Sequence, residues 1–266
     1  MRKNCGFTLV ELIVVMVLMG ILASTLAVFF RPAMDAFFDA RRRADMTDAT
    51  DTALRRMAQD IRRAVPNSLN VIDGTTADGN AACLQIVPTI GGGRYRTDID
   101  TAVPATAALN LDSAAPFRLN VLAQQGNAPA ANDFVVINNQ NGDDVYNGAS
   151  RASIINVGPP LTLNANPTAS GYMGGRFQLV ANAESSVMYT CANNQLTRRV
   201  FNGAPARRLA CEVDGALVAG NVGECTFTYD AAGATFGLLT LRLVMRDVAA
   251  GESVTLGYGI HMDNTP

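Results

Sequence analysis

The chain has 266 residues, enough for one sizeable domain with an appended segment or for two small domains. Its formal net charge is −2, which gives no strong field for a general attraction to nucleic acid or to an anionic membrane surface. Only one histidine is present, which argues against metal sites or catalysis that need several histidines.

The N-terminal region has the pattern of a membrane segment. Two basic residues, Arg2 and Lys3, precede an uncharged run at residues 12–30. As a helix this run spans roughly 28 Å, close to the thickness of a bilayer's hydrocarbon core. The apolar core of a cleaved secretory signal is shorter, about 7–15 residues, and is followed by small residues. Here the run ends in FFRP, so the pattern favours a retained anchor over a removed signal peptide.

Glu11 interrupts the apolar character of this segment. A charge in mid-membrane costs about 2.5–3.5 kcal/mol, and less near the interface, so such a side chain usually has a partner. A cut after Gly6 would create one, because the freed α-amino group of Phe7 would lie one helical turn from Glu11. Opposite charges relieve each other's desolvation only when both are present, on one chain or between neighbouring copies.

The stretch from Gly6 to Glu11 (GFTLVE), behind a short basic leader and ahead of an apolar helix, resembles the class III signal of type IV pilins and type II secretion pseudopilins. The resemblance implies a leader at residues 1–6, cleavage after Gly6 by a prepilin peptidase, and N-methylation of Phe7. It assigns Glu11 to the docking of one subunit against the next. It also implies an α+β, type IV pilin-like fold, with a long N-terminal helix packed on a C-terminal antiparallel β-sheet domain.

The orientation in the membrane is not supported by charge counting. Arg31 and the cluster at 41–43 outnumber the two basic leader residues, contrary to the positive-inside rule. The resemblance alone implies one pass through the inner membrane with the globular domain in the periplasm, and later a place in the pilus at the cell surface. The cluster at 41–43 fits a solvated helix face better than a contact with lipid headgroups or neighbouring subunits.

The helix is expected to cover residues 7–65, with the membrane segment at about 7–30 and the globular domain at 66–266. Pro32 predicts a kink or a short break. Residues 39–51 are polar nearly all round, which predicts a solvated neck. Five apolar residues recur at helical spacing beyond it and are expected to pack on the domain: Leu54, Met57, Ala58, Ile61 and Val65.

Five cysteines are present, and Cys5 lies in the leader. None shows CxxC spacing, which argues against zinc or a thioredoxin-type site. Two disulfides in an oxidising compartment are favoured over four buried thiols. Four cysteines allow three connectivities that the sequence does not distinguish, with a weak preference for Cys211–Cys225 and Cys83–Cys191.

From residue 67 onward the apolar pattern changes to that of strands. Two apolar runs around the polar loop at 192–195 predict a hairpin. The antiparallel sheet that the runs suggest would place one face on the helix and the other on loops. The expected strands are SLNVI (68–72), CLQIVPTI (83–90), FRLNVL (117–122), DFVVIN (133–138), SVMYTC (186–191), LTRRVF (196–201), CTFTYD (225–230), FGLLTLRLVMRD (236–247) and SVTLGYGIHMD (253–263).

Residues 91–131 are expected to form long surface loops apart from the strand at 117–122, because they contain few large apolar residues. A turn-rich connection follows at 139–150. Its side chains offer oxygen ligands for calcium, but EF-hand spacing is absent and a plain turn is favoured, so no metal site and no cofactor is predicted. The candidate ligands are Asn139, Asn141, Asp143 and Asp144.

The sequence does not favour an enzyme. A Ser-His-Asp arrangement would depend on His261, which lies in an alternating strand near the C-terminal end. The glycines at 91–93 lack the Lys-Ser/Thr that completes a phosphate-binding loop. Adjacent carboxylates at 143–144 in a turn do not define a cleft.

A second, looser resemblance concerns the C-terminal domain. VMYTCANNQLTRR, CTFTYD and GESVTLGYGIHMDN resemble the J-type minor pseudopilins and the MshO-type minor pilins of the MSHA pilus, and CLQIVPTIGGGRYR fits the MshO type better. The resemblance implies a low-copy subunit near the tip that primes or caps filament assembly. Its partners would be other minor pilins, the major pilin and the inner-membrane assembly platform. A J-type role in type II secretion, or a tip adhesin or DNA-uptake role, stays open.

Nucleic-acid binding is disfavoured by charge. Without the leader, nineteen arginines face twenty-three acidic residues. A local cluster of arginines could still bind phosphates, although ordinary solvated strand ends explain the cluster equally well. Its members are Arg198, Arg199, Arg207 and Arg208.

Overall fold

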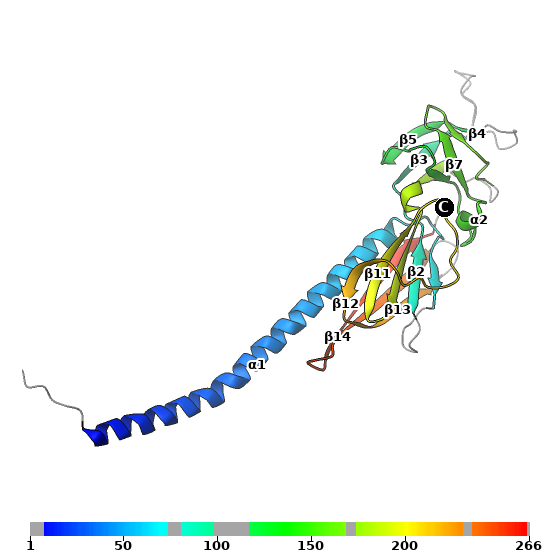
Figure 1. The fold of residues 1–266 in the computed structure, drawn as a ribbon. Coiled ribbons are helices and arrows are strands. Elements are labelled where there is room, and N and C mark those ends of the chain that lie inside the picture. Colours follow the sequence, from blue (N-terminus) through cyan, green and yellow to red (C-terminus); the bar gives the residue numbers. More distant parts are fainter. Residues whose placement is uncertain (1–7, 74–80, 98–116, 169–173, 231–235, 265–266) are drawn as a thin grey trace, which may run out of the picture. The chain divides into compact units, whose positions relative to one another are not determined.

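The computed structural model describes residues 8–73, 81–97, 117–168, 174–230 and 236–264 (Figure 1). It divides into two compact units, residues 1–48 and 49–266, and each is described by itself. Helix α1 (Leu9–Arg62) supplies the described part of the first unit and continues into the second, which holds all the strands. A long N-terminal helix followed by antiparallel sheets is the expected α+β class.

The C-terminal end of α1 falls slightly short of the predicted one. The helix ends at Arg62 because the next backbone groups pair with another part of the chain. Val65 donates its N–H to the Val87 carbonyl at 2.8 Å, and Thr89 donates to the Arg63 carbonyl at 2.7 Å. Tertiary pairing therefore replaces the last helical turn that apolar periodicity alone had predicted.

Two other expectations for α1 need correction. The helix runs through Pro32 without a break, so of the predicted kink or short break the break is wrong, and the kink stays a prediction. The solvated neck was predicted to reach Asp51, yet Thr50 is fully buried, which places the start of packing earlier. Residues 40–45 are exposed, as a neck requires. The predicted start at Phe7 lies outside the described residues.

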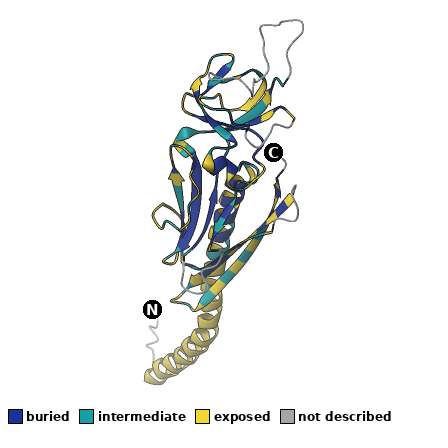
Figure 2. Ribbon diagram, turned by 90° about the vertical axis from the view of Figure 1, so that its right-hand side faces the viewer, coloured by how far each residue is buried: buried dark blue, intermediate teal, exposed yellow. Residues whose placement is uncertain are grey.

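The apolar face at the end of α1 packs inside the β-rich unit. All five predicted face residues are buried, each no more than 2% exposed: Leu54, Met57, Ala58, Ile61 and Val65. Figure 2 shows this buried end of the helix beside buried strands. Burying such a side chain stabilises the fold by about 1.5–3 kcal/mol, so the face holds the helix on the β-rich part.

The helix end packs against a five-stranded sheet of order β1-β2-β10-β11-β12. Strands β10 and β11 form the predicted hairpin, but the turn holds two residues rather than four. Asn193 and Asn194 have positive φ values of 52° and 59°. Such a turn matches the twist of the strands, and asparagine tolerates it. The strands are β1 (Asn70–Ile72), β2 (Ala82–Ile86), β10 (Ser186–Ala192), β11 (Gln195–Phe201) and β12 (Ala216–Gly220).

A three-stranded antiparallel sheet follows, made of β13 (Val222–Asp230), β14 (Phe236–Asp247) and β15 (Glu252–Asp263). Strand β13 contacts β2, β10 and β11, which joins the two sheets. From Phe236 to Leu243 of β14, exposed and buried residues alternate, with Leu239, Leu241 and Leu243 on the buried side. This period-two pattern is the one read from the sequence, and it gives the sheet one apolar face.

A seven-stranded sheet is inserted between β2 and β10, in the order β4-β8-β7-β6-β9-β3-β5. Its edge strands β4 and β5 are joined through Asn120 alone, so the sheet curls until its two edges meet. The curled sheet encloses a core of its own, including Ile137, Leu163 and Phe177, and forms the mainly green part of Figure 1. The strands are β3 (Gly91–Tyr95), β4 (Phe117–Leu119), β5 (Val121–Gly126), β6 (Phe134–Val136), β7 (Arg151–Asn156), β8 (Leu161–Leu163) and β9 (Arg176–Val180).

The prediction of surface loops at 91–131 is therefore partly wrong. Strands β3 and β5 lie there, and residues 98–116 lie outside the described part of the chain. A Cβ on Gly93 would lie 2.0 Å from the Ala123 carbonyl oxygen, and one on Gly92 would lie 2.6 Å from that of Phe177. Only glycine permits this close approach between strands, and the glycines that looked like loop residues instead allow the sheet to curl.

Two disulfides are present, but their pairing corrects the sequence preference. Cys83 pairs with Cys211 and Cys191 with Cys225, at Cα–Cα distances of 5.6 and 6.2 Å. In the β2–β10 register Cys83 lies opposite Thr190. Directly opposed residues share one face of a sheet and the next residue points to the other, so Cys83 and Cys191 lie on opposite faces and cannot bond.

Candidate assembly site

The first turn of α1 is closed by a side-chain cap. Thr8 precedes the helix, and its Oγ1 accepts a hydrogen bond from the backbone N–H of Glu11 at 3.3 Å. A Thr followed three residues later by Glu is the sequence of a capping box. The Glu11 side chain is exposed and lies in the first turn, where the helix dipole favours a negative charge. Gly6 and Phe7, the predicted processing residues, lie outside the described part of the chain.

The surface of α1 that follows is almost entirely apolar. Its large apolar side chains from Leu9 to Phe38 are 44–76% exposed. Among the described residues, α1 is the one helix long and apolar enough to cross a membrane, and none of its most apolar segment is buried. An exposed apolar surface of this extent needs a bilayer or other helices around it.

Polar side chains within this apolar stretch bond to their own helix. The Ser24 hydroxyl donates to the Ile21 carbonyl at 2.8 Å, and the Thr25 hydroxyl donates to the Leu22 carbonyl at 2.9 Å. Back-bonding of this kind satisfies hydroxyl groups where no water is present. These two residues therefore fit a lipid or helix-packed surrounding as well as their apolar neighbours do.

A charged cluster fixes the other end of α1 on the five-stranded sheet. Asp60, with an 11% exposed side chain, accepts hydrogen bonds from Tyr189 and Arg198, each at 2.8 Å. Arg198 also pairs with Glu184, which binds Arg63 at 3.1 Å. Two residues of the helix end and three of the sheet region thus form one network, which sets the rotation of the helix on the sheet.

Burial and hydrogen bonding act in opposite directions on the pKa of Asp60. Burial alone would raise the pKa of this carboxyl group, but the hydrogen bonds from Arg198 and Tyr189 and the charges of Arg198 and Arg63 lower it overall. The pKa of Tyr189 is raised, first by burial and then by the Asp60 charge. Asp60 is therefore ionised and Tyr189 neutral near pH 7, the states that their hydrogen bond requires.

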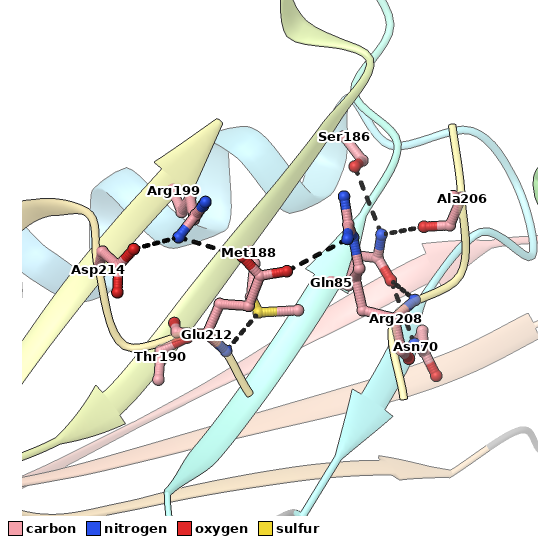
Figure 3. Close-up of polar contacts among 10 residues, drawn as sticks. All are labelled: Asn70, Gln85, Ser186, Met188, Thr190, Arg199, Ala206, Arg208, Glu212 and Asp214. Carbon is pink, nitrogen blue, oxygen red and sulfur yellow. Dashed lines mark hydrogen bonds and ion pairs between the residues drawn. The ribbon is translucent and has the colours of Figure 1, made fainter. Parts of the chain in front are cut away.

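The opposite face of the five-stranded sheet is covered by residues 202–215, here called the strap, which connect β11 to β12. Gln85, fully buried, donates to the Ala206 carbonyl at 2.8 Å and accepts from the Arg208 N–H at 2.9 Å (Figure 3). Thr190 donates to the Glu212 carbonyl at 2.8 Å. Side chains of the sheet thus satisfy the strap's backbone, and the Cys83–Cys211 disulfide ties it covalently.

The four arginines singled out in the sequence do not form a free basic patch, because each has a carboxylate partner. Arg199 pairs with Asp214 at 2.6 Å and with Glu212 at 3.1 Å (Figure 3). Arg208 pairs with Glu212 at 3.3 Å. The remaining pairs are Arg198 with Asp60 and Glu184, and Arg207 with Asp143. These four arginines are therefore better described as members of ion pairs at solvated strand ends than as a phosphate-binding site.

The suggested calcium ligands have different partners. Asn139 donates to the Pro66 carbonyl at 2.7 Å, while the Asn141 amide donates to Asp144 at 3.0 Å. Asp143 faces Arg207 and precedes the one-turn helix α2 (Asp144–Asn147). The favoured plain turn is thus a short helical turn.

The remaining candidate for chemistry is His261. It is exposed in β15, directly opposite Leu238 of β14. The structure thus places it against an apolar side chain on an exposed sheet face.

Sequence reasoning missed two features. The Thr8 cap was readable from the spacing of Thr8 and Glu11, but Glu11 was interpreted only through the need of its carboxylate for a charged partner. The Asp60–Tyr189–Arg198 cluster had no local signal, because its members are separated by up to 138 positions along the chain.

Residues 1–27 match the family described as the prokaryotic N-terminal methylation motif. No curated protein and no solved structure matches the chain. The motif and the exposed apolar helix together indicate a membrane-anchored protein with a globular domain.

Proposed function

We propose that this chain, whose methylation motif supports a subunit of the type IV pilin or pseudopilin type, is a minor pilin that primes or caps assembly of a type IV, MSHA-like pilus. The carrying observation is the motif at residues 1–27, which includes the first part of an exposed apolar helix. A helix of this kind can leave the bilayer only by packing against similar helices, and a filament of such subunits provides them. The role is structural rather than enzymatic.

The proposal includes specific processing steps. A prepilin peptidase removes the leader at residues 1–6 by cutting after Gly6 and methylates Phe7. Glu11 then guides docking against a neighbouring subunit. The long helix, with a proposed start at Phe7 and its end at Arg62, crosses the inner membrane once, and the domain at residues 66–266 lies in the periplasm until incorporation at the cell surface. Partners are the peptidase, other minor pilins, the major pilin and the assembly platform.

Two alternatives are retained. A J-type minor pseudopilin of a type II secretion system shares the N-terminal signal and the C-terminal strand sequences that resemble that group. A tip adhesin or DNA-uptake subunit is the other. The DNA-uptake role is weakened because the arginines at 198, 199, 207 and 208 all pair with carboxylates and are not free to bind phosphates.

Mass spectrometry of the N-terminus tests the processing. Full-length protein is recovered from membranes of cells with and without active prepilin peptidase. We expect a methylated Phe7 terminus only in cells with the peptidase. An intact Met1 terminus in both would mean a signal-anchored domain and would overturn the proposal.

A deletion separates pilus from secretion roles. For the pilus role, we expect loss of surface filaments while secreted enzymes still leave the cell and the other pilins still reach the membrane. Loss of secretion with filaments intact would instead identify the type II secretion alternative.

A further inference from the structure

A polar depression lies on the β-rich unit, outside every feature used for the proposed function. It has a volume of about 510 Å³ and opens between β6, β7 and α2 of the inserted sheet region and the segments that flank the β10–β11 hairpin. A volume of this size lies within the range of small-molecule sites. We call it the amide pocket and define it by its polar lining residues: Asn132, Asn147, Arg151, Ser153, Asn164 and Asn182.

Arg151 is the one charged residue of the lining. Its Nε donates to the Val145 carbonyl at 2.6 Å, and its Nη2 donates to the Tyr146 and Pro205 carbonyls at 3.3 and 3.2 Å. The guanidinium also lies 5.5 Å from the centre of the Phe134 ring. These contacts hold the group firmly in place without neutralising its charge.

No ion pair offsets the charge of Arg151 among the described residues. In the part of the chain that the structure describes, Arg151 forms no ion pair with a carboxylate, and burial lowers its pKa without an opposing acidic neighbour. Arg151 lines the pocket, and its Nη1 makes no hydrogen bond with the described residues. A fixed cation whose Nη1 has no partner among the described residues favours an anionic group such as a carboxylate, because hydrogen bonds to a charged acceptor are stronger than those to a neutral one.

The asparagines around Arg151 present further donors and acceptors. Asn164 is oriented because its Oδ1 accepts the Ser153 N–H at 2.8 Å, and Asn147 is oriented because its Oδ1 accepts the Ala149 N–H at 2.8 Å. In both, the Nδ2 donors remain available to a ligand. The Asn132 and Asn182 side chains form no hydrogen bond with the described residues and can offer both donor and acceptor.

The Arg151 cation and the surrounding asparagine side chains together indicate which class of ligand the pocket would bind. A hydroxyl group both donates and accepts, as a primary amide does, so neighbouring amides suit a polyhydroxylated ring. Ala165 and Ala204 give the pocket apolar wall area for the C–H face of such a ring. A phosphate ester carries about two negative charges and would meet a single cation here. One carboxylate with several hydroxyls fits better.

We propose that the amide pocket binds a hexuronate, a six-carbon sugar acid, with its carboxylate on Arg151 and its hydroxyls on the surrounding asparagines. The proposal does not depend on the filament role, since any membrane-anchored protein with this domain could use the site. One such sugar acid can be free in solution or part of an acidic polysaccharide, and the two sources share the chemistry argued above.

Calorimetric titration of the full-length protein in lipid nanodiscs tests the proposal. Sodium D-glucuronate is the probe, with D-glucose and sodium acetate as comparisons, and we expect saturable glucuronate binding with a Kd on the order of 1 mM. Glucose lacks the carboxylate and acetate lacks the hydroxyls, so each should bind at least about tenfold more weakly. No saturable glucuronate binding, or acetate binding equal to it, overturns the proposal.

Two variants locate the site. Ala204→Trp places a large side chain at the exposed rim and should abolish binding, whereas Ala249→Trp, in the exposed β14–β15 turn, should leave it unchanged. A double variant, Asn132→Gly with Asn182→Ala, removes two amides, and glycine tolerates the positive φ of 71° at position 132. It should raise the Kd about tenfold with an unchanged melting temperature. Binding that persists in Ala204→Trp shows that the pocket is not the site.

A further titration with an oligomer of glucuronate distinguishes the two sources of the sugar. A chain of glucuronate residues that binds at least about tenfold more tightly than the monomer points to an acidic polysaccharide. Equal affinity points to a free or terminal sugar. Either result requires that binding be lost in Ala204→Trp.

Discussion

Glu11 lies in the first turn of α1, and its backbone N–H is already satisfied by the Thr8 hydroxyl. The cap uses the backbone N–H of Glu11 and not its carboxylate, so the two parts of this residue have separable roles. The carboxylate is exposed and sits at the end of a surface that must lie in lipid or against other helices. In that setting its charge becomes favourable when an amine from a neighbouring terminus approaches.

The separation gives a residue-scale prediction. We expect Glu11→Ala to lower incorporation into sheared filaments by at least about tenfold, because it leaves the Phe7 amine of the neighbouring subunit without its partner, and an unpaired charge in lipid costs roughly 2.5–3.5 kcal/mol. Leader cleavage should be unchanged. The matched variant Thr8→Ala removes only the cap and should cost about 1 kcal/mol of helix stability, with a smaller effect on incorporation. Immunoblots of filament and membrane fractions give both quantities, and equal incorporation of Glu11→Ala and wild type would count against the assembly role.

Asp60 gives the second residue-scale prediction. Its pKa is lowered in the folded protein, so its contribution to stability is complete above its unfolded-state pKa of about 3.9 and is lost as pH falls through the lower folded value. Asp60→Asn should reduce the free energy of unfolding by about 2–4 kcal/mol near pH 7.

Melting curves from pH 7 down to pH 3 check this. We expect the difference between wild type and Asp60→Asn to shrink at the acid end of the range. Asp51→Asn, which removes an exposed partner of Arg55, is the control and should change stability by less than about 1 kcal/mol. A difference that stays constant with pH would show that the ionised carboxylate is not the source of the effect.

At the scale of elements, the end of α1 combines an apolar face with one charged network. The apolar face supplies most of the binding energy, because it removes large side chains from water. The contacts of Asp60 with Tyr189 and Arg198 fix which way the helix is turned, because hydrogen bonds are directional and apolar contacts are not. A shift of one residue along the helix would separate the carboxylate from both partners.

The helix–sheet contact gives an element-scale prediction. Ile61 is fully buried, and Ile61→Ala should lower the free energy of unfolding by about 2–5 kcal/mol through lost burial and a residual cavity. Gln59→Ala, two residues earlier on the exposed face, should change it by less than about 0.5 kcal/mol. Denaturant titration of the two variants measures both. Similar values for the pair would mean that α1 does not dock through this face.

For the whole molecule, the disulfides act on both faces of one sheet. Cys83–Cys211 holds the strap on the face that also carries Gln85, and Cys191–Cys225 joins β10 to β13 on the other. The first bond spans 128 residues and so encloses the inserted seven-stranded sheet, whereas the second spans 34. The insertion is therefore closed covalently at its base as well as by the β2–β10 pairing.

This topology gives the last prediction. Peptide mapping without reduction should recover Cys83 linked to Cys211 and Cys191 linked to Cys225. Replacing either pair by serine should lower the free energy of unfolding by about 2–5 kcal/mol, with the larger loss for the longer loop in the chain-entropy description. Recovery of a Cys83–Cys191 peptide from native protein would contradict the β2–β10 register.

The sequence by itself determined the features that depend on local pattern. The apolar run, the signal from Gly6 to Glu11, the buried face of α1 and the long alternating strands at 236–247 and 253–263 were all readable, because helix and strand periods appear directly in neighbouring residues. Short strands such as β8, with three residues, carry too little pattern to be recognised. The glycines of β3 looked like loop residues in the sequence because glycine is common in loops, whereas here they allow a neighbouring strand to approach closely.

Only the tertiary structure decided which distant residues meet. Pairing register placed Cys83 and Cys191 on opposite faces, and the strap brought Cys211 across to the first. The curl of the inserted sheet depends on its first and last strands meeting, and the amide pocket draws its lining from segments spread over residues 132–204. Periodicity records which way a side chain faces along its own element, but carries no information about the neighbour that the chain brings against it.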